Sequence, residues 1–381
     1  EAKMEQRKYQ ICTNCVMDTS DPEIRFDENG RCDFCDNFYN TILPNWHPDE
    51  TGKRKLEAIA QKIKEQGRGK KYDCIIGVSG GVDSSYLLHY SKAVLGLNPL
   101  AFTVDTGWNL NVAVENIEKL VRKLGIDLYT EVVDWNEMKD LQVAFLKSQV
   151  PYQDLPQDQA IFAGLYNYAA KHGFKYILTG ANYSMEGVKP PYEWTYLSDL
   201  RMLKDIHRKF GKGKLKTYPL CGMFRKRFYY RYVRGMKEIH PLNMIPYEKE
   251  DAIRTLKEKY DWEKYENKHY ENIFTRFYEG YWLPKKFGYD KRRIYLSNMI
   301  LTGQMTREEA LKNLSSSPYS EKDALEDLEY VAKKLSMKRE DIIDLMEGEK
   351  KTFRDYKNSA WLLKGFIRTA KLFGIEKRNF R

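Results

Sequence analysis

Long apolar runs are missing from this chain of 381 residues. No stretch approaches the ~20 consecutive apolar residues that a membrane-spanning helix needs, and the mean hydropathy is −0.67. The first residues, from Glu1 to Met4, do not form the charged and then apolar pattern of a signal peptide. We therefore expect a cytoplasmic protein that has no membrane partner.

Internal repeats and low-complexity segments are missing as well. With 42% hydrophobic residues, the chain can bury sizeable cores. Its length exceeds that of a typical single domain, which contains about 100–200 residues. We therefore expect two or three domains.

Cysteine is scarce, and its distribution is uneven. Four of the six cysteines form two C-x₂-C pairs, Cys12 with Cys15 and Cys32 with Cys35, which are separated by sixteen residues. Four thiolates at this spacing fit a tetrahedral zinc ion, and such a closed site is structural and not catalytic. Disulfides are disfavoured in a cytosolic chain, and a redox dithiol needs only one pair. An iron–sulfur cluster remains an alternative to zinc.

A glycine pair lies between a predicted strand and a predicted helix. The apolar run that ends at Val78 predicts a buried strand, and residues 86–90 predict the first turns of a helix. The residues between them are Ser79, Gly80, Gly81, Val82, Asp83, Ser84 and Ser85. Glycines let backbone N–H groups approach a phosphate at a helix N-terminus. The serine hydroxyls add donors, and Asp83 offers a carboxylate for Mg²⁺.

The Lys-Ser/Thr pair of a Walker A loop is absent from this segment, which disfavours transfer of a γ-phosphate. The segment instead resembles the pyrophosphate loop (PP-loop) of the ATP pyrophosphatase family, which includes GMP synthetases, NAD synthetases, asparagine synthetases and tRNA thiolases. The resemblance implies an enzyme that cleaves ATP between the α- and β-phosphates and adenylates an oxygen of its substrate. Ammonia or sulfur then displaces AMP. Ser79 and Asp83 are the catalytic candidates of the loop.

Strand and helix patterns alternate along the chain after Tyr72. Strands are predicted at 73–78, 100–105, 128–134 and 176–180, and helices at 84–95, 111–124 and 158–172. This alternation is typical of an α/β fold with a doubly wound parallel sheet, which the resemblance identifies as adenine nucleotide alpha hydrolase-like. Ligands of such sheets bind at the carboxyl ends of the strands, so the loops after Val78, Val104 and Thr179 are expected to surround one pocket.

The resemblance assigns further ATP contacts to two strand ends. In the resembling family the end of the second strand contacts adenine through backbone groups, which here are those of Phe102 and Val104, with Asp105 nearby. A later strand end carries a glycine-containing contact, which here corresponds to Gly180 and Asn182. The alternative for both strand ends is an ordinary turn.

Basic residues are concentrated in one segment. Residues 200–235 carry twelve Lys or Arg against one acid, Asp205, whereas the whole chain has a net charge of +10. Such a concentration predicts a localised anionic partner. Arginine binds phosphate and carboxylate bidentately, so Arg225 and Arg227 are candidate substrate ligands. Glu186 is a further candidate, for the substrate or for the metal.

After about residue 249 the chain is predicted to be helical. Residues 306–309 have the form of a capping box, and residues 321–335 and 339–347 are amphipathic. We therefore predict a zinc-ribbon-like module at 1–50, the α/β domain at 51–245 and a helical region at 246–381.

Three stretches, residues 268–277, 283–293 and 301–307, resemble the N-acetyl sugar amidotransferase family of bacterial surface-polysaccharide (O-antigen) biosynthesis. The resemblance implies that ATP and Mg²⁺ activate an acetamido group of a nucleotide-linked sugar, such as a UDP-diacetamido uronic acid. Ammonia then converts this group into an acetamidino group. No glutaminase region is apparent, so the ammonia is expected from a separate glutaminase pair that resembles the two subunits of imidazole glycerol phosphate synthase.

Charged residues of these stretches are candidates for handling the sugar nucleotide. Lys291, Arg292 and Arg293 are candidates to bind its diphosphate and carboxylate. Lys268 and Arg276 are candidates to neutralise the charge that develops during the reaction. The alternative is a solvated or structural ion-pair face.

The alternative function is tRNA modification by a thiolase-like PP-loop enzyme. Such enzymes also join a zinc-binding module to the loop, and aromatic and basic residues alternate in residues 224–232. However, thiolases commonly use cysteines in or beyond the loop domain. Only Cys74 and Cys221 lie outside the two pairs, and both are expected to be inert. We therefore expect no nucleic-acid partner.

Overall fold

A computed structural model describes residues 7–191, 193–194, 199–264, 271–317, 319–362, 365 and 369. Within these residues, one sheet contains five strands: β1 (Cys74–Gly77), β2 (Pro99–Asp105), β3 (Leu128–Val132), β4 (Tyr176–Leu178) and β5 (Lys237–Ile239). The strands are all parallel, in the order β3-β2-β1-β4-β5. The order reverses between β1 and β4, as in a doubly wound sheet.

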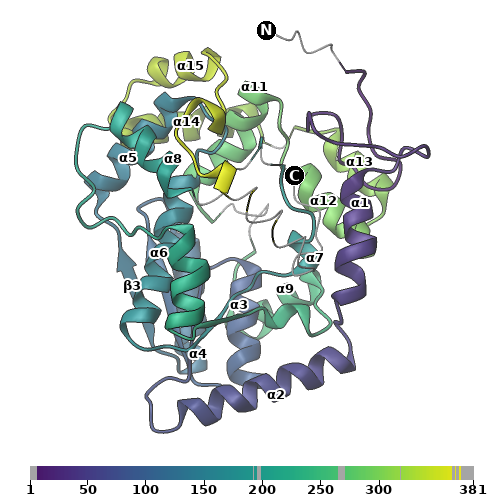
Figure 1. Ribbon diagram of the computed structural model, residues 1–381, viewed down its shortest axis with the longest axis vertical. Coiled ribbons are helices and arrows are strands. Elements are labelled where there is room, and N and C mark those ends of the chain that lie inside the picture. Colours follow the sequence, from purple (N-terminus) through teal and green to yellow (C-terminus); the bar gives the residue numbers. More distant parts are fainter. Residues whose placement is uncertain are drawn as a thin grey trace.

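Helices surround this sheet (Figure 1). The α-helices of the described residues are α1 (Asp33–Asn37), α2 (Glu50–Gly67), α3 (Val82–His89), α4 (Asn111–Leu124), α5 (Trp135–Ser148), α6 (Leu155–Lys171), α7 (Tyr183–Glu186), α8 (Leu200–Phe210), α9 (Lys249–Tyr260), α10 (Ile273–Phe277), α11 (Leu283–Phe287), α12 (Arg292–Leu301), α13 (Arg307–Leu314), α14 (Glu321–Leu335) and α15 (Arg339–Glu347). Short 3₁₀ or π-helical segments are η1 (Phe38–Ile42), η2 (Leu43–Asn45), η3 (Tyr90–Val94), η4 (Arg225–Val233), η5 (Pro241–Asn243), η6 (Tyr278–Trp282) and η7 (Phe353–Asp355).

Alternate residues of the central strands face two separate cores. Ile75 of β1 and Phe102 of β2 lie in the core on one face of the sheet, whereas Cys74, Ile76 and Ala101 lie in the core on the other face. The alternation follows from the two-residue period of a strand. Because both faces are covered, β1 is an uninterrupted apolar run in the sequence.

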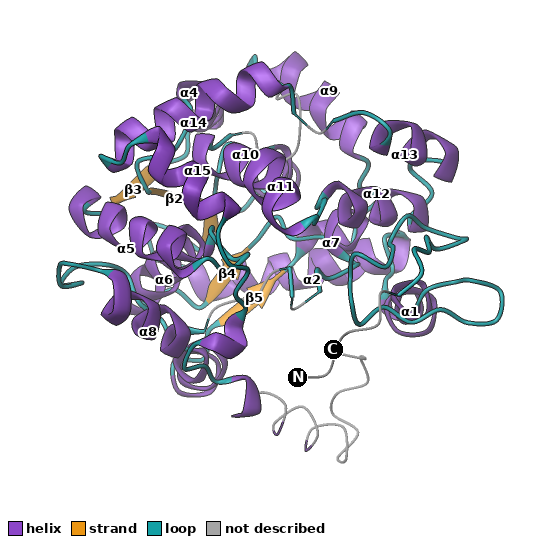
Figure 2. Cartoon of the chain, turned by 90° about the horizontal axis from the view of Figure 1, so that it is seen from above, coloured by secondary structure: helices purple, strands orange, loops and turns teal. Residues whose placement is uncertain are grey.

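The C-terminal helices are part of these cores. Leu256 of α9 lies in the same core as Ile76. Phe274 of α10 and Leu328 of α14 lie in the core that contains Phe102. In Figure 2, α14 and α15 are drawn next to β2 and β3, and α10 and α11 are drawn beside α15. The core of the α/β unit thus continues beyond residue 245, and the three-part division of the chain stays a prediction.

The structure confirms the predicted α/β fold with its parallel sheet, and the four predicted strands correspond to β1 to β4. The predicted helices at 111–124, 321–335 and 339–347 are α4, α14 and α15. Thr306 and Glu309 form the predicted capping box at the start of α13. Across the described residues, no helix is both long enough and apolar enough to cross a bilayer.

Candidate active site and cysteine cluster

The glycine-rich loop lies at the point where the strand order of the sheet reverses. It connects β1, the central strand, to α3, and β1 pairs with both β2 and β4. In open α/β sheets, ligands bind in the crevice at the carboxyl ends of the strands at this point. The fold therefore positions residues 78–85, hereafter the PP-loop, in the expected ligand crevice.

The backbone of the PP-loop depends on its first glycine. Gly80 has a φ of 84°, which is favourable for glycine and strained for other residues. A Cβ at this position would also lie 2.7 Å from the carbonyl oxygen of Ala113 in α4. Trp262 donates its indole N–H to the Gly80 carbonyl over 3.1 Å and so holds the loop from the other side.

Serine hydroxyls of the PP-loop are mutually hydrogen-bonded. The Ser79 and Ser84 Oγ atoms are 3.3 Å apart, and the Gly81 N–H donates to Ser79 Oγ over the same distance. The Ser85 hydroxyl is buried and makes no hydrogen bond to any described residue. The predicted loop residues are thus gathered around the N-terminus of α3, where unpaired N–H groups favour an anion.

Asp83 lies in the first turn of α3 and has a specific partner. Its carboxylate accepts a hydrogen bond from the Tyr247 hydroxyl. Burial, and then the Asp83 charge, raise the pKa of Tyr247 well above its ordinary value, so this hydroxyl stays protonated and donates. Tyr247 thereby fixes the orientation of the carboxylate.

The predicted adenine contacts on β2 are adjacent to the loop. Phe102 is buried, and its carbonyl accepts a hydrogen bond from the Val78 N–H over 2.8 Å. Val104 is buried as well. Asp105 ends the strand, and its carboxylate accepts a bond from the Gly107 N–H over 2.7 Å. A contact of these residues with adenine stays a prediction.

The residues predicted after the fourth strand lie beside the start of α3. A Cβ at Gly180 would lie 2.9 Å from the backbone of Asp83 and Ser84, so only glycine allows this approach. Asn182 is buried and caps α7 by accepting from the Met185 N–H over 3.0 Å. Glu186 is the last residue of α7.

A segment from the C-terminal part of the chain lies against the PP-loop. The Glu271 carbonyl accepts from the Leu110 N–H over 2.9 Å, and the Ile273 N–H donates to the Trp108 carbonyl over 3.1 Å. A Cβ at Gly81 would lie 3.2 Å from Oε1 of Glu271. Residues 271–273 therefore lie between the PP-loop and the loop that follows β2.

The predicted charged residues of the C-terminal region have protein partners. Arg276 donates to both carboxylate oxygens of Asp327 at 2.8 and 2.7 Å. Lys291 forms an ion pair of 2.8 Å with Glu279, in which both side chains are largely buried. These contacts join α10 to α14 and the start of α12 to η6.

The two arginines that follow Lys291 also contact the protein. Arg292 binds Asp290 and donates to the carbonyls of Asn313 and Ser316. Arg293 donates to the Val16 carbonyl over 2.8 Å. Substrate binding by these residues stays a prediction, and Lys268 lies outside the described residues.

Arg225 and Arg227 are exposed on η4, which packs beside α6 through Tyr230. The Tyr230 hydroxyl donates to Asn167 of α6. These two arginines are thus on a different element from Lys291, which precedes α12.

The four N-terminal cysteines form one cluster. The Sγ atoms of Cys12, Cys15, Cys32 and Cys35 all lie within 4.8 Å of one another. Backbone N–H groups point at the sulfurs, as the Cys32 N–H does at the Cys12 Sγ over 3.2 Å. A set of four buried thiolates can hold a metal ion and fits tetrahedral zinc.

The cysteine cluster is tied to the C-terminal helices. Arg307, at the start of α13, donates to the carbonyls of Cys12 and Cys15 at 2.7 and 3.1 Å. The Val16 N–H donates to Ser297 of α12 over 3.2 Å. Figure 1 shows α1 beside α12 and α13. The cysteine cluster is therefore hydrogen-bonded to α12 and α13.

The two remaining cysteines are poor nucleophiles. Burial raises the pKa of the Cys74 thiol well above its ordinary value. Burial is also the main cause that raises the pKa of Cys221, against the lowering effect of Arg225. Both thiols therefore stay protonated at neutral pH. Since a thiol reacts as its thiolate, protonated thiols are poor nucleophiles.

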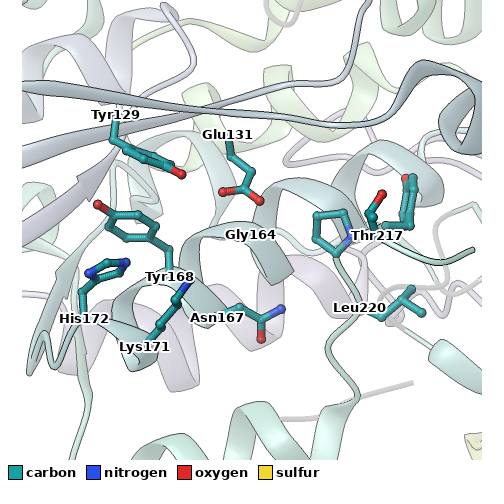
Figure 3. Close-up of a pocket in the computed structure, with 11 residues that line it drawn as sticks. Tyr129, Glu131, Gly164, Asn167, Tyr168, Lys171, His172, Thr217 and Leu220 are labelled. Carbon is teal, nitrogen blue, oxygen red and sulfur yellow. The ribbon is translucent and has the colours of Figure 1, made fainter.

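A cavity of about 440 Å³ opens between β3, α6 and residues 217–220 (Figure 3). Tyr129, Glu131, Tyr168 and His172 line it. None of the PP-loop residues belongs to its lining. We therefore take the PP-loop and the residues around it, and not this cavity, as the candidate active site.

Tyr247, Trp262 and Glu271 contact the PP-loop but were not among the predicted site residues. Glu271 lies in residues 268–277, one of the stretches that resemble the amidotransferase family. This resemblance was the one sequence feature that pointed to Glu271 as a site residue. Tyr247 and Trp262 follow the basic segment, where the sequence gives no pattern that points to the loop.

Comparisons with known proteins found partial matches to this chain. Residues 271–371 match the family described as LPS biosynthesis protein WbpG-like, C-terminal domain. An uncharacterised protein of Methanocaldococcus jannaschii is 28% identical over 199 residues, which cover 48% of this chain and 70% of that protein. A glutamine-hydrolysing GMP synthase of Gibberella zeae is 35% identical over 121 residues, which cover 31% of this chain and 21% of that protein.

Among solved structures, the predicted subunit of a tRNA methyltransferase from Methanocaldococcus jannaschii has a TM-score of 0.29 and 14% identity. The match covers 49% of this chain and 76% of that chain. The family match begins at Glu271, the residue that lies against the PP-loop. Residues 271–371 of this chain are thus similar to the WbpG-like C-terminal domain of LPS biosynthesis proteins, and they follow the α/β unit that contains residues 78–85.

Proposed function

We propose that the protein is an ATP-dependent amidotransferase that converts an acetamido group of a nucleotide-linked sugar into an acetamidino group. One observation carries the proposal: Glu271, where the match to the WbpG-like domain begins, lies against Gly81 of the PP-loop, and its carbonyl accepts from the Leu110 N–H. A segment similar to surface-polysaccharide proteins and a loop suited to phosphates are thus in direct contact. A UDP-diacetamido uronic acid is the substrate that we favour.

The proposed chemistry follows from the weakness of an amide as an electrophile. Transfer of AMP from ATP to the amide oxygen gives an O-adenylyl imidate and releases pyrophosphate. Mg²⁺ held by Asp83 would supply Lewis-acid stabilisation of the departing pyrophosphate. The N–H groups and hydroxyls of the PP-loop would bind the phosphates. Ammonia then attacks the imidate carbon, and AMP leaves.

The ammonia is proposed to come from a partner enzyme. Glutamine hydrolysis by an amidotransferase requires an activated thiol. Four of the six cysteines belong to the cluster, and burial raises the pKa of both Cys74 and Cys221. We therefore propose a separate glutaminase pair that resembles the subunits of imidazole glycerol phosphate synthase.

The proposal predicts which nitrogen source supports turnover. The purified chain, given ATP, Mg²⁺ and an acetamido sugar nucleotide, is expected to turn over with ammonium chloride and not with glutamine alone. Mass spectrometry of a panel of UDP- and CMP-linked acetamido sugars is expected to show a product lighter by about one mass unit, since C=O becomes C=NH. Turnover with glutamine alone would contradict the need for a partner, and the absence of an amidine with every sugar would contradict the proposed reaction.

A second candidate function, tRNA modification, is favoured by the surface of η4. Phe224, Phe228 and Tyr232 are 75%, 50% and 66% exposed on this segment, and exposed arginines lie between them. Aromatic and basic side chains of this kind stack on and neutralise single-stranded RNA. A strongly salt-dependent affinity for tRNA, with tRNA-stimulated AMP formation and no response to sugar nucleotides, would favour this function over the sugar reaction.

The close approach of Gly180 predicts an effect on nucleotide use. Gly180→Ala places a methyl group 2.9 Å from the backbone of Asp83 and Ser84, so the start of α3 must shift. We expect AMP formation to fall by about 10²-fold, the cost of a shift of about 1 Å in a reacting group. Gly222→Ala is the matched control, since its Cβ would lie at an ordinary 3.5 Å from Leu200. Equal activity of both variants would show that the contact has no role.

A further inference from the structure

A buried chain of hydrogen bonds leads from the end of β2 to the N-terminus of α6. The Thr106 hydroxyl donates to Oε1 of Gln157 over 2.9 Å, and Asn272 Nδ2 donates to the same atom over 2.7 Å. Gln157 Nε2 then donates to Oδ1 of Asp154 over 3.1 Å. Thr106 and Gln157 are 1% and 2% exposed, so these bonds are shielded from competing water.

The chain of bonds fixes Asp154 from both parts of the protein. Gln157 belongs to α6 of the α/β unit, whereas Thr275 belongs to α10 of the WbpG-like domain, and its hydroxyl donates to Asp154 Oδ1 over 3.2 Å. Asn272, which bonds Gln157, follows Glu271, the residue against Gly81 of the PP-loop. Asp154 is therefore linked through Gln157 to Asn272, the residue that follows Glu271.

The second carboxylate oxygen of Asp154 remains available. Both bonds from Gln157 and Thr275 end on Oδ1, and no described residue donates to Oδ2. Asp154 is partly exposed, and its Oδ2 is not among the fully buried polar atoms without a partner in the described part of the chain. The charged groups that act on it are Lys291 from the start of α12, Asp158 from the next turn of α6 and Glu279 from η6.

We propose that Asp154 is the base that accepts a proton from ammonia during attack on the adenylated substrate. This inference rests on the proposed function. In the step, the lone pair of ammonia forms a C–N bond to the imidate carbon, and one N–H proton of the resulting ammonium passes to Oδ2. The C–O bond to AMP then breaks, AMP leaves with the bonding pair, and the amidinium product remains.

The electrostatics of the site agree with this role. Burial raises the pKa of Asp154 to about 7, and Asp158 and Glu279 act in the same direction against Lys291. A base with a pKa near the working pH can accept a proton and release it again within a turnover. The four carboxyl and ammonium groups also carry a net negative charge, which attracts ammonium from solution.

The test separates the two chemical steps. Asp154→Asn keeps the shape of the side chain and the acceptor for Gln157 and Thr275. We expect ATP–pyrophosphate exchange with UDP-diacetamido uronic acid to persist, while amidine formation from ammonium chloride falls by about 10²–10⁴-fold. With free ammonia held constant, the wild-type rate is expected to rise through about pH 7, where Asp154 loses its proton, and this rise is expected to be absent in the variant. The attack of hydroxylamine depends less on a general base than that of ammonia. Hydroxylamine is therefore expected to restore part of the rate of Asp154→Asn.

The outcomes identify which claim fails. Asp127→Asn, an exposed site beside β3, is the matched control, and thermal unfolding checks that both variants fold. Amidine formation by Asp154→Asn at the wild-type rate would overturn the role of Asp154. Loss of both the exchange reaction and amidine formation in a folded variant would also overturn it. Absence of exchange in the wild type with every acetamido sugar would instead overturn the proposed function.

Discussion

Asp83→Asn is expected to abolish the release of AMP and pyrophosphate while leaving the fold intact. Asp83 lies in the first turn of α3 beside the PP-loop, and its carboxylate is the hard ligand that the loop offers to Mg²⁺. Asparagine keeps the shape and the acceptor for the Tyr247 hydroxyl but removes the charge. We expect the rate to fall by about 10³-fold or more, because preorganised charge at such a site typically contributes this much.

Two further variants define the role of Asp83. Tyr247→Phe removes only the hydrogen bond to the carboxylate, and it is expected to lower the rate less than Asp83→Asn does. Asp127→Asn changes an exposed carboxylate at the sheet edge and is expected to keep wild-type turnover. Full turnover by Asp83→Asn, measured as pyrophosphate release, would show that Asp83 does not hold the metal.

Cys12→Ser is expected to remove bound zinc and to lower the stability of the protein strongly. The cluster is held by four buried thiolates, and Arg307 donates to the carbonyls of Cys12 and Cys15 from α13. Binding of structural zinc contributes about 10–16 kcal/mol in small zinc domains at neutral pH. Loss of about 5 kcal/mol of this would lower the Tm by about 6 °C in a chain of this size.

The measurement combines metal analysis with thermal unfolding. The wild type is expected to contain one zinc per chain, and Cys12→Ser to contain much less and to unfold at a lower temperature. Cys221→Ser is the control, since Cys221 lies outside the cluster and its thiol is buried elsewhere. Iron in place of zinc would favour an iron–sulfur cluster, and unchanged stability without metal would contradict the structural role.

The sequence predicts the central fold well, because the elements there have strong local patterns. β1 and β2 are apolar on both faces, and the cysteine spacing leads directly to the cluster. β5 and α5 are among the elements that were not predicted. β5, from Lys237 to Ile239, is a short edge strand whose residues are mostly exposed, so it lacks an apolar pattern. α5, from Trp135 to Ser148, begins directly after the strand predicted at 128–134, and it was not recognised as a helix.

The site could be predicted only in part, because its walls come from distant segments. The PP-loop residues are consecutive, and the sequence therefore shows them together. Asp154 and Thr275 are 121 positions apart, and their contact depends on packing of α10 against the α/β unit. Charge patterns gave less information. Arg276 and Lys291 are basic residues of a family-like stretch, but the structure pairs them with Asp327 and Glu279.

The identity of the nucleotide products tests the central claim most directly. With ATP, Mg²⁺, ammonium chloride and the sugar nucleotide, chromatography is expected to show AMP, pyrophosphate and amidine in equal amounts. This result requires cleavage between the α- and β-phosphates, as the PP-loop without a Walker A lysine predicts. ADP and orthophosphate, formed in step with the amidine, would contradict the account.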